Sequence, residues 1–330
     1  MTGKKCLVIG SCLIVLFLNV AGCGGKEKPD APAKVQSINI ATGTTGSAYY
    51  PMGKAMAKLF DRRIPNVKTV AVATAGTSQN IFMMQKKEAE IAFAHNGVAY
   101  YAYNGKAMFQ EKPANFLRGI TNLYPNVVHI MVAANSNITS IKDFRGKTFV
   151  LGIVGSAIEI NLTEILNLHG INYKEDKDGK SKFVDYPEAA AALKEGLVDG
   201  IIIAGGLPIP AIQNSASLQQ TRILSIEPDM IAKMKETLPW YSEITIPKGT
   251  YKGQTEEVKT LVAANLLICR DDLSTDLVYN MTKTLFENRE ELIAANLLAK
   301  DMTLQDALKG MTLPLHPGAE KYYREMGIIK

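Results

Sequence analysis

Apolar and helical patterns alternate along the chain between residues 37 and 94. Apolar runs of strand length occur at 37–41, 67–73 and 91–94, and the segments 48–60 and 78–87 between them have helical spacing. Strands that alternate with helices in this way are typical of a mostly parallel sheet with helices on its faces. The pattern therefore predicts an α/β unit in this part of the chain.

A second alternating series begins near residue 138 and predicts another α/β unit. A longer apolar run precedes this series, and a strand and a strongly amphipathic helix follow it. We interpret the late strand as the return of the chain to its first unit. The expected strands are 127–133, 148–151, 182–184, 200–203, 222–225 and 261–269, and the expected helices are 159–169, 187–195, 208–214 and 273–288.

Two α/β units with a returning chain predict two lobes that are joined by two crossing strands. We expect lobe 1 to contain residues 35–128 and 255–330, and lobe 2 to contain residues 129–254. Each lobe is expected to hold a mostly parallel sheet, with a ligand cleft between the lobes. Segment 239–254 has no clear periodicity, and we expect it to be irregular.

The first residues of the chain have the pattern of a secretory leader. Lys4 and Lys5 precede the apolar segment 6–20, which is shorter than the roughly 20 residues that cross a bilayer. The sequence Val-Ala-Gly-Cys at 20–23 resembles the bacterial lipobox, which is cut before a Cys that becomes lipidated. An uncleaved N-terminal anchor and cleavage at another position are the alternatives.

This leader predicts where the protein is found. We expect residues 1–22 to be removed as a lipoprotein signal peptide, Cys23 to carry lipid, and residues 23–34 to form a flexible linker. The mature chain would then be exported and bound to the membrane through its lipid, on the outer side of the bacterial cytoplasmic membrane or in the periplasm.

The cysteine count adds a constraint on the fold. Of 4 Cys in the chain, Cys6 and Cys12 lie in the expected leader. Once Cys23 is lipidated, Cys269 has no partner, so we expect no intramolecular disulfide. Because Cys269 lies in an apolar run, it is expected to pack as a small buried hydrophobe.

Charge and motif content argue against several functional classes. The 37 Lys and Arg exceed the 32 Asp and Glu by a net charge of +5, and no long basic run is present, so a nucleic-acid partner is not expected. The chain has no pair of His at i and i+4 and no Cys pair after the leader, and we expect neither a metal nor a cofactor. It has no G-x-S-x-G or H-E-x-x-H motif either. The sequence therefore favours a protein that is not an enzyme, and we expect it to be a monomer.

Glycine-rich turns follow the expected strands and open the expected helices. In the first turn, Gly43 and Gly46 allow a tight approach of the backbone, Ser47 is a candidate N-cap, and Pro51 fits the first helical turn. This turn lacks the Lys-Ser/Thr of a nucleotide-binding P-loop. Helix starts at the carboxyl ends of parallel strands are places where ligands bind.

Four further turns repeat this composition at 74–80, 95–97, 152–157 and 205–208. None of the five turns contains Arg or Lys. We therefore expect helix N-termini and hydroxyl groups to hold a small anion in one shared site. The candidate ligand-binding residues are Gly43, Thr44, Thr45, Gly46, Ser47 and Tyr49 in the first turn, Gly76, Thr77, Ser78 and Asn80 in the second, His95 and Asn96 in the third, Gly155, Ser156 and Ala157 in the fourth, and Gly205 and Gly206 in the fifth.

His95 has two interpretations. At a strand end it could bond a ligand carboxylate and make binding sensitive to pH, and it could equally be a surface or loop histidine. Ser47, Ser78 and Ser156 also have two interpretations, as helix caps that contact ligand or as nucleophiles of an exported hydrolase. Their places at helix starts favour the first.

Six stretches stand out along the chain: IATGTTGSAYYPMG at 40–53, ATAGTSQN at 73–80, LYP at 123–125, IKDFRGK at 141–147, YKGQ at 251–254 and PLHPGA at 314–319. In this order they resemble the TAXI-type solute receptors of TRAP transporters, and the resemblance runs from about residue 38 to 327. The chain departs from the family at two turns. It has Ala157 and Ile158 where the family usually has Gly-Thr in the fourth turn, and His95 and Asn96 where the family often has Gln or Asp in the third.

The resemblance implies a type II periplasmic-binding-protein fold and delivery of a solute to a TRAP-type permease that is driven by an ion gradient. It also implies an anionic metabolite such as glutamate, glutamine or a dicarboxylate as ligand. The receptor of an ATP-driven importer with the same fold is the first alternative. An exported serine hydrolase and a sensory lipoprotein remain further alternatives.

Overall fold

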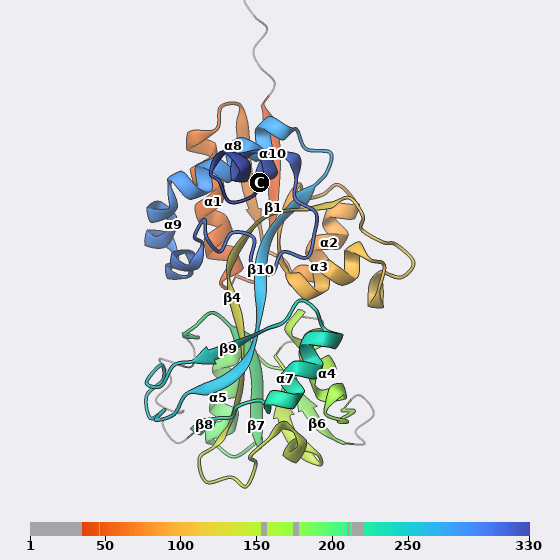
Figure 1. Ribbon diagram of the computed structural model, residues 1–330, viewed down its shortest axis with the longest axis vertical. Helices are drawn as coiled ribbons and strands as arrows, with labels where there is room; N and C mark the ends of the chain where they lie inside the picture. The colour runs from red at the N-terminus through yellow and green to blue at the C-terminus, as the bar shows by residue number, and fades with distance from the viewer. Residues whose placement is uncertain (1–34, 46, 153–156, 174–177, 210–211, 213–220) are drawn as a thin grey trace, which may run out of the picture. The chain divides into compact units, whose positions relative to one another are not determined.

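The computed structural model (Figure 1) describes residues 35–45, 47–152, 157–173, 178–209, 212 and 221–330. The expected signal peptide, the linker and Cys23 lie outside these residues. Gly46, Gly155 and Ser156 also lie outside them. Ala157 is the first residue of a helix, and its side chain is not described.

The described strands form one sheet in the order β2-β1-β3-β10-β4-β7-β5-β6, with β8 paired to β4 and β9 paired to β10. The pairs of β1 with β2 and β3, and of β5 with β6 and β7, are parallel. The strands are β1 (Gln36–Ala41), β2 (Val67–Val72), β3 (Ile91–His95), β4 (Leu117–Ala133), β5 (Lys147–Val150), β6 (Gly179–Lys182), β7 (Gly200–Gly205), β8 (Thr221–Ile223), β9 (Ser242–Ile246) and β10 (Val258–Arg270).

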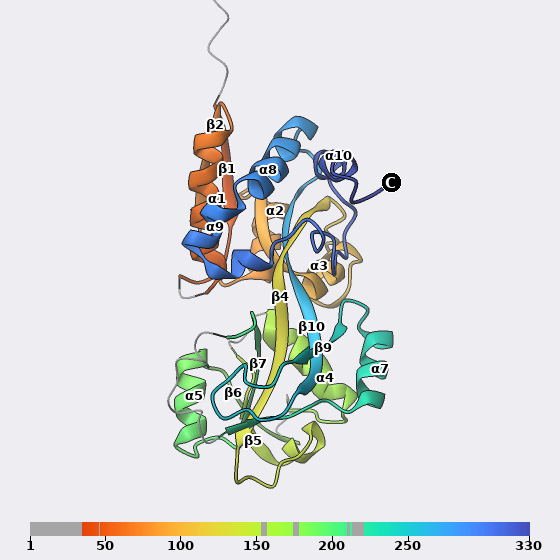
Figure 2. The same cartoon turned by 60° about the vertical axis from the view of Figure 1, so that its left-hand side comes forward.

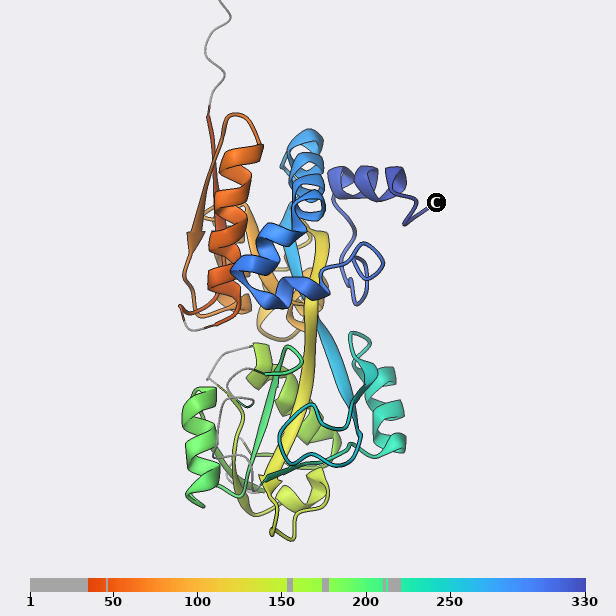
Figure 3. The same cartoon turned by 90° about the vertical axis from the view of Figure 1, so that its left-hand side faces the viewer.

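The long strands β4 and β10 pair antiparallel, with Leu117–Val127 beside Val262–Arg270, and both strands continue into the second part of the sheet (Figures 1 and 3). β10 also pairs with β3, and β4 also pairs with β7. The expectation that each lobe holds a sheet of its own is therefore wrong, because the described strands belong to one sheet. Because β10 pairs with both β3 and β4, and β4 pairs further along with β7, the two parallel parts join into a single sheet.

Helices cover both faces of this sheet. In the part that contains β5 to β7, α5 and α7 lie on opposite sides of the strands (Figure 2). The helices are α1 (Tyr49–Arg63), α2 (Thr77–Gln85), α3 (Asn96–Tyr103), α4 (Ala157–Leu168), α5 (Tyr186–Lys194), α7 (Pro228–Thr237), α8 (Thr275–Glu287), α9 (Arg289–Ala295) and α10 (Pro317–Glu325), with short 3-10 helices η1 (Ala107–Phe109), η2 (Ile141–Phe144) and η4 (Leu297–Asp301).

β10 shows how the sheet buries apolar residues on both faces. Leu267 and Cys269 pack with α1, α8 and α10, whereas the alternate residues Leu266 and Ile268 pack with α2 and α3. A strand buried on both faces reads as one continuous apolar run, which is what the sequence has here. Cys269 is 0% exposed, so its expected role as a small buried hydrophobe is confirmed, and burial raises the pKa of its thiol.

The same division by faces holds in the second part of the sheet. Val128 and Ile130 of β4 pack with α4 and α7, and Val127 and Met131 pack with α5. No helix in the described parts of the chain is both long and apolar enough to span a bilayer. The expected helix at 208–214 falls largely outside the described residues, and β9 lies in the segment that was expected to be irregular.

Candidate functional site

The first and second glycine turns are joined by direct hydrogen bonds. The backbone N–H of Thr74 donates to the carbonyl of Gly43 at 3.0 Å, and the Thr74 hydroxyl donates to the carbonyl of Thr42 at 3.2 Å. Asn80 Nδ2 donates to the carbonyls of Thr42 at 2.6 Å and Phe93 at 2.8 Å. Because Asn80 also accepts from the Thr74 hydroxyl, its side chain is engaged in holding β1, β3 and α2 together.

The third turn joins the same network. The backbone N–H of His95 donates to the Thr77 hydroxyl at 3.0 Å, and the Tyr49 hydroxyl, which also bonds Thr77, donates to Asn265 Oδ1 at 2.6 Å. Asn265 stands opposite His95 on β3 and opposite Tyr124 on β4. The starts of α1, α2 and α3 therefore meet, and we call residues 42–45, 47–49, 74–78 and 95–97 the helix-start site.

The starts of α1 and α2 have no side-chain cap. Their N-caps are Ala48 and Gly76, neither with a side-chain hydrogen bond, and neither helix has an acidic residue in its first turn. Gly76 has a φ of 115°, which favours glycine. Helix N-termini without acids or caps attract negative charge.

The expectation that Ser47 and Ser78 cap these helices is wrong. Ser47 lies one residue before the N-cap, and its hydroxyl donates to the carbonyl of Thr44 at 2.8 Å. Ser78 lies within the first turn of α2, and its buried Oγ has no hydrogen-bond partner among the described residues. A buried hydroxyl without a partner is unusual, and it marks Ser78 as a group that can bond a ligand.

His95 is the N-cap of α3, and its Nδ1 accepts from the backbone N–H of Gly97 at 3.1 Å. The residue is 2% exposed, and burial lowers the pKa of His95 to about 3. Its imidazole is therefore neutral at physiological pH. The low exposure shows that the alternative of a surface residue is wrong, and the lowered pKa argues against the expectation that titration of His95 makes binding pH-sensitive.

Three tyrosines lie near one another at this site. Tyr186, the first residue of α5, interacts electrostatically with Tyr49 and Tyr124, and burial raises the pKa of all three hydroxyls. The Tyr49 and Tyr124 rings are 6.3 Å apart. The Tyr186 hydroxyl donates to the carbonyl of Ala204, directly before Gly205. This bond brings the fifth turn to the edge of the helix-start site.

The fifth turn is held closely from two sides. A Cβ on Gly206 would lie 2.4 Å from Cδ2 of Leu298 on η4, so no larger residue fits without a shift. The backbone N–H of Ile209 donates to the Tyr251 hydroxyl at 2.9 Å, and that hydroxyl bonds His129 Nε2 at 2.8 Å. These contacts fix the turn after β7 onto β4.

Other candidate residues have different surroundings. Thr44 and Thr45 are exposed, and Gly43 is buried, where a Cβ would lie 2.5 Å from the Ser47 hydroxyl oxygen. The Asn96 side chain bonds residues outside the other turns: its Nδ2 donates to the carbonyls of Trp240 at 3.1 Å and Gly310 at 3.0 Å. Asn96 therefore connects α3 to the segment after α7.

The sequence analysis did not assign four residues of this region to the site, and it named one of them, Tyr124, only within a stretch that resembles a family. Tyr124, Asn126, Tyr186 and Asn265 all lie in or beside the crossing strands or the fifth turn, and the two asparagines are 5% and 3% exposed. The signal that could have found them is an amide inside an apolar strand run, because burial of a polar side chain in a strand needs a reason. A register shift of β4 against β10 beside Asn265 marks the same place, and such bulges are common at functional sites.

The chemistry available at this site is hydrogen bonding by neutral groups. Among the described residues, no Asp, Glu, Lys or Arg falls in the buried class, and no group of three or more His, Cys, Asp or Glu could hold a metal ion. Ser47 is bonded to a backbone carbonyl, and no base lies within hydrogen-bond distance of the Ser78 hydroxyl in the described part of the chain. The arrangement can bind and orient a solute, and neither Ser47 nor Ser78, the two candidate serines that the structure describes, is activated as a nucleophile.

Similar solved structures share this architecture. PhnD1 from Prochlorococcus marinus (MIT 9301) in complex with methylphosphonate has a TM-score of 0.56 at 9% identity, over 89% of this chain and 99% of that chain. XAC2383 from Xanthomonas citri bound to chloride ion has a TM-score of 0.54 at 12% identity, over 88% and 95%. The periplasmic aliphatic sulphonate binding protein SsuA from Escherichia coli has 0.47 at 17% identity, over 87% and 78%. The first two confirm the expected two-lobed α/β fold.

The sequence also matches a family model over most of its length. The model of the NMT1-like family matches residues 40–327, from the end of β1 to beyond α10. The matched range includes the helix-start site, the fifth turn and both crossing strands. The chain therefore belongs to the NMT1-like family.

Proposed function

We propose that the protein is an extracytoplasmic solute-binding receptor that holds a small organic anion at the helix-start site and delivers it to a membrane importer. The observation that carries this proposal is the meeting of three helix starts, none with an acidic residue in its first turn. Membership of the NMT1-like family and the fold shared with methylphosphonate-bound and chloride-bound proteins support it.

The magnitudes are sufficient for binding without a buried Arg. Micromolar affinity requires roughly 8 kcal/mol. A helix N-terminus gives an anion about 0.3–1 kcal/mol, and up to about 2 kcal/mol when partly buried. Each hydrogen bond to a charged group adds roughly 1.5–3 kcal/mol. Three helix starts and the Ser78 hydroxyl together reach this value at the upper end of these ranges.

The class of importer is a separate part of the proposal. The sequence resemblance implies a TRAP-type permease, whereas the comparisons return the NMT1-like family and a phosphonate-bound protein and do not single out the TAXI type. These findings fit the receptor of an ATP-driven importer better. We therefore put the ATP-driven importer first and the ion-gradient-driven permease second, and the transporter genes next to this gene distinguish them.

We further propose that the ligand closes two lobes over itself. The lobes are residues 35–128 with 255–330, and residues 129–254, and they bend at β4 and β10. A ligand that contacts Ser78 on one lobe and the turn at 205–206 on the other stabilises only the closed form. Export and lipidation at Cys23 belong to the same proposal, and mass spectrometry of the mature N-terminus tests them.

The site assignment is tested with serine variants. Native mass spectrometry of protein purified without refolding identifies a retained solute, and isothermal titration then uses that solute, methylphosphonate and L-glutamate as probes. Ser78→Ala is expected to weaken binding of the highest-affinity probe by about 1–3 kcal/mol, because the Ser78 hydroxyl, which has no partner among the described residues, is available to bond the ligand. Ser47→Ala should have a smaller effect, since its hydroxyl already bonds Thr44.

Ser242→Ala on β9 is the matched control, because Ser242 is exposed and far along the chain from the turns. Circular dichroism should show the same folded spectrum for all variants. Wild-type affinity in Ser78→Ala would refute the site assignment.

A further inference from the structure

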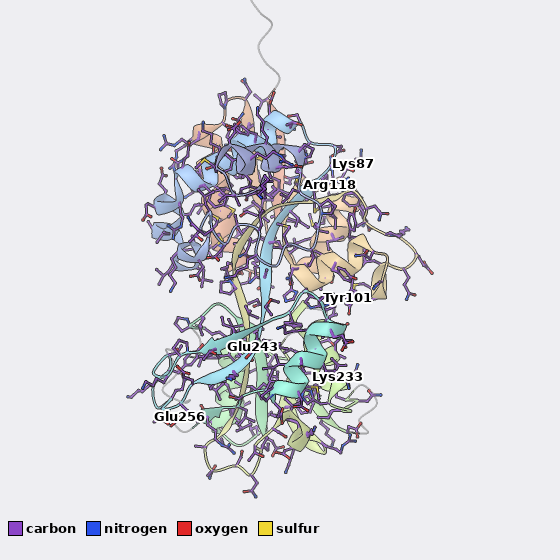
Figure 4. All side chains as sticks on the ribbon, in the orientation of Figure 1. Lys87, Tyr101, Arg118, Lys233, Glu243 and Glu256 are labelled. Atoms are coloured by element: carbon purple, nitrogen blue, oxygen red, sulfur yellow. The ribbon has the colours of Figure 1, made fainter. Side chains whose placement is uncertain are left out.

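A pocket is lined entirely by residues outside the helix-start site. Its volume is about 380 Å³, and it lies between the later turns of α3, the later turns of α4 and the segment after α7. Figure 4 labels Tyr101, which lies where α3 approaches α4 and α7. We call it the Trp240 pocket. Its aromatic, charged and amide residues are Tyr100, Tyr101, Lys106, Glu164, Asn167 and Trp240.

Two buried atoms of residues that line this pocket have no hydrogen-bond partner within the described part of the chain. They are Oε2 of Glu164 and Nε1 of Trp240. Tyr101 links the two residues: its hydroxyl donates to Oε1 of Glu164, and its ring lies edge-on to Trp240 with centroids 4.9 Å apart. Trp240 is only 3% exposed. Buried polar atoms are normally paired, so two unpaired polar atoms in residues that line the same pocket indicate that a hydrogen-bonding partner is missing there.

The two orphaned atoms require opposite partners. A carboxylate oxygen of Glu164 accepts a hydrogen bond, whereas the indole N–H of Trp240 can only donate one. A molecule that carries both an ammonium and a carboxylate group supplies both partners. Lys106 adds a positive charge at the same pocket, with its Nζ 5.1 Å from the centroid of the Tyr100 ring.

The aromatic residues define the rest of the ligand. The Tyr100 and Trp240 rings are 5.5 Å apart, and the Tyr100 and Tyr101 rings are 6.2 Å apart. Aromatic faces pack well against aliphatic groups and also stabilise an ammonium ion. An apolar side chain next to the two charged groups fits this lining.

We propose that the Trp240 pocket is a second binding site, which takes a small zwitterionic amino acid with an apolar side chain. The ammonium group donates to Glu164, and the carboxylate accepts from Trp240 and pairs with Lys106. Because both orphaned atoms are buried in the wall, binding is accompanied by a rotation of the Glu164 or Trp240 side chain.

The electrostatics of Glu164 agree with this role. Burial raises the pKa of Glu164 to about 7, against the smaller opposing effect of the Tyr101 hydroxyl. The nearby Tyr241 hydroxyl interacts with the same carboxyl. An incoming ammonium group therefore meets a carboxyl close to its titration point and stabilises the ionised form.

The location gives this site a consequence for the whole chain. α3 follows β3 in the first α/β series, whereas α4 and α7 belong to the second, so an occupant contacts both. Asn96 already joins the two through the carbonyl of Trp240. The proposal does not rest on the function proposed for the helix-start site.

Fluorescence tests the proposal directly, because Trp240 is the only tryptophan of the chain. L-leucine is titrated against two analogues that each lack one charge, L-leucinamide and N-acetyl-L-leucine, with calorimetry in parallel. We expect a saturable change in emission with L-leucine and an affinity at least about tenfold lower for both analogues. Glu164→Gln should weaken L-leucine by at least about tenfold, and the exposed control Glu188→Gln on α5 should not.

Several results would overturn the proposal. These are wild-type protein that does not bind L-leucine by either method, analogues that bind as well as L-leucine, and Glu164→Gln with unchanged affinity. A response that is lost in Ser78→Ala but kept in Glu164→Gln would place L-leucine at the helix-start site. That outcome overturns the second site and leaves the function proposed for the first site intact.

Discussion

The helix-start site and the Trp240 pocket differ in how their buried polar groups are hydrogen-bonded. At the helix-start site the buried amides and the buried histidine are neutral, and Asn80 and Asn265 are bonded to the fold. At the Trp240 pocket a carboxylate oxygen and an indole N–H are buried without a partner among the described residues. The first region is held mainly by hydrogen bonds between neutral groups and keeps the Ser78 hydroxyl for a ligand, whereas the second keeps one acceptor of a titratable carboxyl and one donor that an added molecule could satisfy.

This difference separates the two regions by their response to substitution and to pH. A preorganised network should respond to a lost amide with a loss of stability, because its partners stay buried. A region with a raised carboxyl pKa should respond to pH instead. The following predictions test this contrast.

The largest effect is expected from Asn80→Ala. The substitution leaves the carbonyls of Thr42 and Phe93 and the hydroxyl of Thr74 without their bonds to Asn80, which is 0% exposed. The free energy of unfolding should fall by about 3–5 kcal/mol, as measured by urea unfolding. Asn104→Ala is the control, because Asn104 is exposed and should cost less than about 1 kcal/mol. Equal losses in both variants would contradict the preorganised network.

Next in size is the effect of pH on Glu164. Its pKa is about 7 in the folded chain against an ordinary 4.5, so between these values the folded state binds more protons than the unfolded state. Stability should therefore fall as pH rises through this window and level off above it. Glu164→Gln should remove about 1–3 kcal/mol of this fall, after allowance for partial exposure.

His95 should show the opposite sign in the same measurement. Its pKa is lowered to about 3 from 6.5, so below about pH 6.5 the unfolded state takes the proton first and stability falls with acidification. Urea unfolding across pH for wild type, Glu164→Gln and His95→Gln separates the two terms. If the slope of the unfolding free energy against pH changed in the same direction in both variants, the electrostatic contrast between the two regions would be refuted.

The smallest effect is expected from Gly206→Ala. The new Cβ would lie 2.4 Å from Leu298 Cδ2, so it should push the fifth turn away from η4 and weaken solute binding by about 1 kcal/mol. Leu298→Ala in the same chain opens the space and should restore the affinity. A double variant that binds no better than Gly206→Ala would show that this contact does not limit closure.

The sequence analysis predicted most elements, but the strand that it predicted for β4 was too short. The expected strand at 127–133 begins at Leu117 in the structure. Asn122, Pro125 and Asn126 interrupt the apolar pattern, and proline is normally excluded from a central strand. These residues are tolerated because a register shift occurs beside them. Pattern analysis therefore fails at the place where the strand passes the candidate site.

The candidate site was predicted in part for a similar reason. Glycine and serine spacing located the turns, but it could not show that Ala48 and Gly76, rather than serines, stand at the helix starts. It also could not find Tyr186 or Asn265, because the contacts that bring them to Tyr49 and Tyr124 join distant parts of the chain. The Tyr49–Asn265 bond alone spans 216 residues.

β10 follows β3 and β4 by a long distance in the sequence, and this affects folding during synthesis. β3 and β4 both pair with β10, and Asn265 finds partners 141 and 216 residues earlier. During synthesis, the facing edges of β3 and β4 have no strand between them until residues 258–270 emerge. Long-range pairing of this kind slows folding, so the nascent chain stays open and exposes strand edges until its last fifth has been made.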